Sequence, residues 1–143
     1  MKTMSKYFKL EELLQSKTAL AYKIENLPSW QVVSNLERLA AILDIVREKL
    51  GIPITVTSGF RGTKLNAKVK GSKGSQHMLG EAADITCKDN AKLFNTIKEL
   101  MEQGIIEVGQ LIWEYGTKKQ PEWVHVSLPN ANHHNEIKYI GVK

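Results

Sequence analysis

The chain has 143 residues, of which 42% are hydrophobic and 24% charged, and its formal net charge is +5 at pH 7. These proportions are ordinary for a folded globular protein and exclude collagen, a coiled coil and wholesale disorder. No apolar run approaches the roughly 20 residues of a membrane-spanning helix, so we expect no membrane insertion. The length predicts one domain over residues 1–143, and the lone Cys87 excludes an internal disulfide and a cysteine-rich zinc cluster.

The basic charge allows two interpretations. A nucleic acid, an anionic membrane or a bacterial cell wall would attract it, whereas a lysine-rich solvated surface needs no such partner. Only three of the 20 basic residues are arginines, whose planar side chains recognise bases and phosphates best. We therefore expect no nucleic-acid partner. A lysine-based nucleic-acid binder remains an alternative, and it predicts strongly salt-dependent DNA affinity.

The first residues, MKTMSKYFKL, lack the continuous apolar core of a secretory signal. We therefore expect synthesis in the cytoplasm, so that an extracellular substrate would be reached only by another route.

Periodicity predicts two helices and a strand in the first 60 residues. A short helix is expected over residues 10–14. Ser29 can cap a longer helix over 30–50, and Gly51 suits the left-handed position after its end. Apolar residues recur every three or four positions along this helix, at Val33, Leu36, Leu39, Ala40, Leu43, Val46 and Leu50. The β-branched segment 54–58 predicts a strand.

The second half of the chain predicts mainly strands. A long polar loop over 60–80 precedes a strand over 82–87, and Asp89 can cap a helix that ends at Gly104. Further strands are expected over 105–108, 110–115 and 123–128. Early helices followed by strands that look antiparallel favour an α+β fold with a small antiparallel sheet and helices packed on it. Trp30 and Trp113 are expected in the core.

Polar residues on two of these strands suggest a metal site. Alternation places Asp84 on one face of its strand among small neighbours, and places His125 on the face of its strand opposite the apolar residues. His77 ends the polar loop, and long loops in compact domains are often functional. If the two strands are neighbours, His77, Asp84 and His125 can meet. Two histidines and a carboxylate form a common catalytic zinc set.

Three sequence elements resemble the zinc D-alanyl-D-alanine carboxypeptidase family, which includes the L-alanyl-D-glutamate endopeptidases of phage endolysins. Residues 75–84 match the pattern S-x-H-x-x-G-x-A-x-D at every fixed position. Residues 58–61 resemble S-G-[YF]-R, and residues 122–126 combine E-x-x-H with W-[VI]-H-V. Segments 8–13 and 16–19 are similar to the small phage and prophage branch. The resemblance spans about residues 7–128.

The resemblance implies an antiparallel sheet covered by helices, similar to the Hedgehog and DD-peptidase folds. It implies one zinc ion held by His77, Asp84 and His125. It also implies Glu122 as the catalytic base and Arg61 as a catalytic and substrate-binding residue. Ser75 and Trp123 are further candidates for substrate contact.

Strict strand alternation is a difficulty for Glu122, because it places this residue on the face opposite His125. Glu122 reaches the metal only if the backbone departs from a regular strand near Pro121. Glu114, on the preceding strand, is the second candidate for the base. His133 and His134 are expected in an exposed turn and receive no role.

We therefore expect a monomeric zinc peptidase that hydrolyses an amide bond in peptidoglycan stem peptides, either as a carboxypeptidase or as an endopeptidase. An endolysin-like enzyme of this kind would act on the wall after holin- or lysis-dependent release. The alternative is a wall-binding or phage structural module that keeps the metal site without turnover. A group able to accept a proton at the metal would separate the two.

Overall fold

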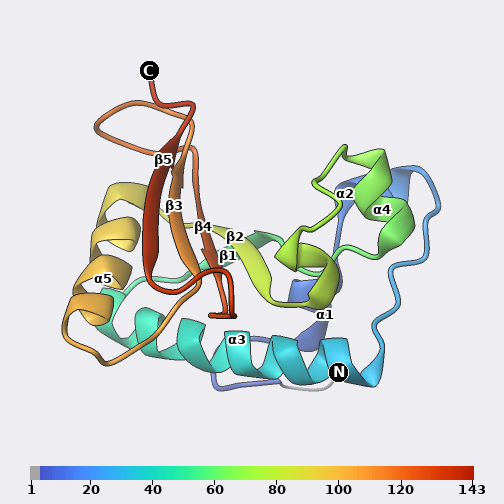
Figure 1. Ribbon diagram of the computed structural model, residues 1–143, viewed down its shortest axis with the longest axis horizontal. Coiled ribbons are helices and arrows are strands. Elements are labelled where there is room, and N and C mark those ends of the chain that lie inside the picture. Colours follow the sequence, from blue (N-terminus) through green and yellow to red (C-terminus); the bar gives the residue numbers. More distant parts are fainter. Residues whose placement is uncertain (1–3) are drawn as a thin grey trace.

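The computed structural model describes residues 4–143, which form several helices and one sheet (Figure 1). The first three residues of the predicted 1–143 domain lie outside the described residues. The elements in chain order are α1 (Leu10–Leu14), α2 (Lys17–Ala21), α3 (Trp30–Leu50), β1 (Thr55–Ser58), α4 (Thr63–Lys68), the 3₁₀ helix η1 (Gln76–Leu79), β2 (Ala82–Thr86), α5 (Asn90–Glu102), β3 (Gln110–Glu114), β4 (Trp123–Ser127) and β5 (Glu136–Ile140).

The predicted caps define the ends of the two longest helices of residues 4–143. The Ser29 side chain accepts a hydrogen bond from the Val32 N–H, and Gly51 follows the last turn of α3 with a φ of 78°. Asp89 caps α5 by accepting from the Lys92 N–H. Each cap oxygen satisfies an N–H that the first turn of a helix leaves without a partner.

Within the described residues the sheet has five strands in the order β1-β2-β4-β3-β5. The first four pair antiparallel, but β5 pairs parallel with β3. The α+β fold is thus confirmed, and its small sheet is mostly antiparallel. β5 runs antiparallel to β4, as a hairpin partner would, but it pairs at the far edge with β3, which also runs antiparallel to β4, so the β3–β5 pairing is parallel.

One face of the sheet forms the hydrophobic core with α3 and α5. Strand alternation points one set of side chains toward the helices, and these residues are almost fully buried. They are Val56, Ala83, Ile85, Leu111, Trp113, Val124 and Val126. The opposite set, which includes Asp84, Glu114 and His125, points away from this core. The remaining short helices gather beside β1 and β2 (Figure 1).

Some local expectations differ from the structure. Residues 105–108 form no strand, because the N–H groups of Ile105 and Ile106 bond to the Leu100 carbonyl at the end of α5, and the Val108 N–H bonds to Asn135. The polar loop over 60–80 contains α4 and η1. Trp113 is buried as expected, but Trp30 is 89% exposed, because it opens α3 before the buried stripe begins at Val32.

Among residues 4–143, no helix is both long and apolar enough to cross a membrane.

Candidate metal centre

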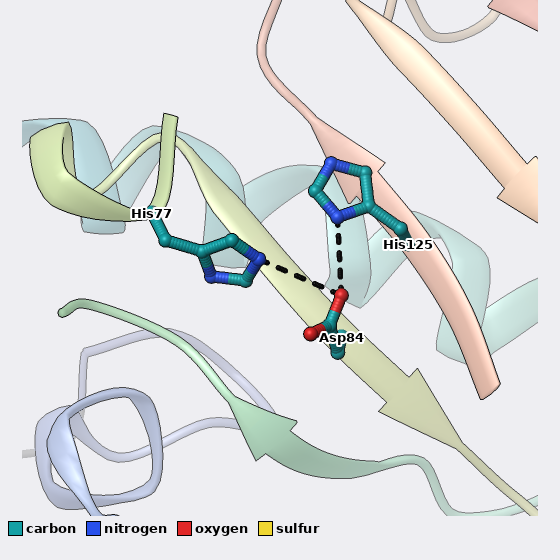
Figure 2. A group of neighbouring side chains, drawn as sticks. All are labelled: His77, Asp84 and His125. Atoms are coloured by element: carbon teal, nitrogen blue, oxygen red, sulfur yellow. Dashed lines mark hydrogen bonds and ion pairs between the residues drawn. The ribbon is translucent and has the colours of Figure 1, made fainter. Parts of the chain in front are cut away.

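The three predicted ligands converge on one point of the sheet. Asp84 and His125 are direct cross-strand partners of β2 and β4, so their side chains leave the same face. The Oδ1 atom of Asp84 lies 3.0 Å from Nδ1 of His125 and 3.5 Å from Nε2 of His77 (Figure 2). One donor atom from each residue falls within 4.8 Å of the other two. This spacing suits a shared cation.

The backbone around η1 places the His77 side chain beside Asp84 of β2. Ser75 accepts a hydrogen bond from the His77 N–H and so caps η1. Gly80 then turns the chain into β2 with a φ of 71°, where a Cβ would lie 2.8 Å from Val32. Glycine is therefore required at position 80 for both conformation and space.

A carbonyl fixes the tautomer of His77. Nδ1 of His77 lies 2.8 Å from the Gly59 oxygen, and because a carbonyl only accepts, Nδ1 must carry the proton and donate it. Nε2 is then the nitrogen with a lone pair, and it faces Asp84. Metal-binding histidines are commonly oriented in this way.

Asp84 carries its charge at neutral pH. Burial raises its pKa, but its interactions with His125 and His77 more than offset this effect, so that the net pKa of Asp84 lies well below its usual range. Its backbone is also held, because the Thr57 hydroxyl donates to the Asp84 carbonyl beside the bulge in β1. Two imidazoles and an ionised carboxylate, held in place, fit a divalent zinc-type ion.

A cleft of about 600 Å³ opens over this cluster. It is lined by all three ligand candidates together with Arg61, Ser75, Glu114 and Trp123. The structure therefore brings together every predicted site residue except Glu122.

Glu122 does not join the cluster. Its side chain is exposed and does not line the cleft, and its N–H bonds to the Glu114 carbonyl just before β4 begins. Glu122 lies in a bend just before β4, so the backbone departs from a regular strand there, but this departure does not bring the Glu122 side chain into the cleft.

Glu114, in contrast, lies in the cleft beside His125. It pairs with Trp123 across β3 and β4, and its Oε1 lies 3.9 Å from Nδ1 of His125. Burial is the main cause that raises its pKa, and the charge of Asp84 raises it further. A carboxylate whose pKa is raised binds a proton more readily in the neutral range.

Arg61 reaches the cleft from the loop after β1. Its N–H bonds to the His77 carbonyl, and its Nη2 donates to the Ser75 hydroxyl over 3.3 Å. Burial lowers the pKa of Arg61, while Asp84 and Glu114 oppose that shift. The buried Nε has no hydrogen-bond partner within residues 4–143, so part of the guanidinium is free for a ligand.

His133 is a cleft residue that the sequence patterns did not predict. It lies on the connection between β4 and β5 and lines the cleft, with Nδ1 2.9 Å from Oε1 of Glu136. No sequence pattern marked it, because its position depends on the unpredicted return of β5. His134, in contrast, does not line the cleft.

A buried donor set of two histidines and one aspartate, beside a carboxylate and a guanidinium in an open cleft, defines the class of metal-dependent hydrolases. The family model described as Peptidase M15 matches residues 6–127. The chain therefore belongs to the Peptidase M15 family, the metallopeptidase family that its motifs resemble. A search of the curated proteins found none that matches the chain.

Proposed function

We propose that this protein is a zinc metallopeptidase that hydrolyses an amide bond in peptidoglycan stem peptides. The observation that carries the proposal is the convergence of His77, Asp84 and His125 beside Glu114 and Arg61 in one cleft. The family membership supports the reaction class, and the resemblance of residues 58–61 and 75–84 supports the substrate class.

The ligand atoms we assign are Nε2 of His77, Nδ1 of His125 and Oδ1 of Asp84. Three protein ligands are typical of catalytic zinc, since a further coordination position is then open. A bound zinc ion would polarise the scissile carbonyl and lower the pKa of a water molecule toward neutrality.

We assign the role of base to Glu114 instead of Glu122. Glu114 lies beside His125 on the face of the sheet that carries the ligands, whereas Glu122 is exposed and does not line the cleft. Oε1 of Glu114 takes the proton of the attacking water and later delivers it to the departing amine, so that Glu114 acts as a general base and then as a general acid.

Arg61 and the two other predicted contact residues bind the substrate in this proposal. The free part of the Arg61 guanidinium holds a substrate carboxylate or the oxygen on which charge develops. Ser75 orients that guanidinium through its hydroxyl. Trp123, whose ring lies 5.1 Å from that of Tyr115, forms an aromatic wall for the peptide.

The biological setting belongs to the same proposal. An endolysin-like monomer would act on the cell wall after holin- or lysis-dependent release, in keeping with the resemblance of residues 8–13 and 16–19 to the phage and prophage branch. Basic charge suits the anionic wall.

Digestion of purified peptidoglycan tests the function. The zinc-loaded protein, a chelator-treated sample and the Asp84→Asn variant are compared, and the fragments are identified by mass spectrometry. We expect hydrolysed stem peptides, with the new carboxylate and the new amine that cleavage of one amide bond leaves, only in the zinc-loaded sample. Released D-alanine would define a carboxypeptidase, and internal cleavage an endopeptidase. Wall binding without any fragment would instead favour the non-catalytic module.

A further inference from the structure

A second groove, of about 620 Å³, lies beside the metal cleft between α2 and β1. Thr18 and Leu20 of α2 line one side, and all four residues of β1 line the other. Arg61 and Val69 line both the groove and the metal cleft. The two hollows therefore meet at these residues and together form a longer channel with the metal ligands on one side of Arg61.

The strand that borders this groove is an open edge of the sheet. Within residues 4–143, β1 pairs with β2 alone, and none of its backbone groups bonds to any element on the outer side. Such an edge presents N–H and C=O groups that an extended peptide can pair with. The exposed Thr55 and Thr57 leave this edge uncovered.

The charges of the groove suit a peptide that carries carboxylates. Among the described residues, Lys17 and Arg61 are the charged side chains that line it, and no acidic residue does so. Arg61 stands at the junction with its buried Nε unpartnered. A cation with an unpartnered donor where the two hollows meet is well placed to hold a substrate carboxylate or carbonyl.

The same strand also positions the metal ligands. Thr57 donates to the Asp84 carbonyl, and the Gly59 carbonyl just after β1 holds His77. A peptide paired with β1 would therefore lie in a fixed relation to the donor atoms, which is the alignment that hydrolysis of a particular bond requires.

We propose that the groove between α2 and β1 is a subsite for the main chain of the peptide substrate, which continues from the metal cleft past Arg61 and pairs with the outer edge of β1. The inference rests on the proposed peptidase function for the identity of the occupant. Because main-chain pairing adds binding at a distance from the scissile bond, it predicts that the substrate extends beyond that bond on the Arg61 side.

Hydrogen–deuterium exchange on the zinc-loaded Glu114→Gln protein tests the pairing directly. The probe is a soluble peptidoglycan stem pentapeptide, confirmed intact by mass spectrometry after each exposure. We expect slower exchange at the N–H groups of Thr55–Ser58 that face away from β2. Protection confined to the metal cleft would overturn the proposal.

A matched pair of variants tests the groove itself. Thr18→Trp fills the groove, whereas Ala21→Trp adds the same side chain to an exposed position of α2 that lines neither hollow. We expect Thr18→Trp to weaken pentapeptide binding about tenfold and Ala21→Trp to leave it unchanged. Equal affinity of the two variants would contradict the subsite.

A second pair of variants tests the groove in case Thr18→Trp does not fold. Lys17→Glu and Lys23→Glu make the same charge change at two exposed positions, of which only Lys17 lines the groove. We expect weaker binding in Lys17→Glu alone.

The outcomes separate this subsite from the proposed function. Hydrolysis by the wild-type protein without protection of β1 would support the peptidase function and refute the subsite. Protection of β1 without hydrolysis by the wild-type protein would support the subsite and refute the peptidase function.

Discussion

Oε1 of Glu114 lies 3.9 Å from Nδ1 of His125, although 11 positions separate the two residues in the sequence. The antiparallel pairing of β3 and β4 causes this proximity, because Ile112 and Glu114 lie opposite His125 and Trp123. Strand pairing thereby places a carboxylate beside His77, Asp84 and His125 from a strand that contributes none of these three residues.

Glu114→Gln tests the assignment of the base. We expect kcat to fall by about 10²- to 10⁴-fold, the usual contribution of general acid–base catalysis, while the zinc content stays the same. Hydrolysis of stem peptides and metal analysis on the same sample provide the measurements. Glu122→Gln is the matched control and should keep nearly full activity. Activity that is kept in Glu114→Gln and lost in Glu122→Gln would instead identify Glu122 as the base.

His77→Ala tests the metal site. Loss of one of three ligands should lower the zinc bound per chain, and it should remove the rise in melting temperature that zinc causes by binding to the folded state. Elemental analysis after dialysis and thermal unfolding with and without zinc measure these effects. His134→Ala is a control because that side chain is 61% exposed and does not line the cleft. Equal zinc content in both variants would refute the assignment.

Gly59→Ala tests the support of His77. An added Cβ would lie 2.3 Å from the Leu13 carbonyl oxygen, so the backbone that holds His77 must move. Loss of such a supporting hydrogen bond typically weakens metal affinity about 10- to 100-fold. Competition with a chromophoric chelator measures the affinity. Gly74→Ala, where a Cβ meets nothing within 4 Å, should bind zinc as the wild type does.

Asp89→Ala tests a cap remote from the cleft. Its carboxylate accepts hydrogen bonds from the Gln120 side chain and the Lys92 N–H, which lower its pKa in the folded state. A lowered folded pKa gives stability that is present above the unfolded pKa of about 4 and lost as pH falls through the folded value. The variant should therefore melt a few degrees lower at pH 7 and show a smaller deficit near pH 2.

Asp89→Asn separates the cap from the charge. The amide oxygen still caps α5, so most of the stability at pH 7 should remain. The pH-dependent contribution of the side chain at position 89 to stability should disappear. A melting-temperature deficit of Asp89→Ala that is the same at both pH values would contradict the electrostatic contribution of Asp89.

The sequence alone determined the features that depend on local periodicity and capping. The α3 helix has the predicted bounds of 30–50, because its apolar spacing, its serine cap and its terminal glycine all agree. Strand alternation placed Asp84 and His125 on faces away from the core, and the motif spacing selected His77. Each of these inferences uses neighbours within a few residues along the chain.

Only the tertiary structure decided which of the two glutamates lies at the metal cluster. Glu122 is near His125 in the sequence, but it lies in the bend before β4 with an exposed side chain, whereas strand pairing brings Glu114 to the ligands. The parallel β5, the place of His133 and the groove along β1 likewise depend on contacts between distant segments. Periodicity specifies which face of an element a residue occupies, but pairing between elements decides what that face meets.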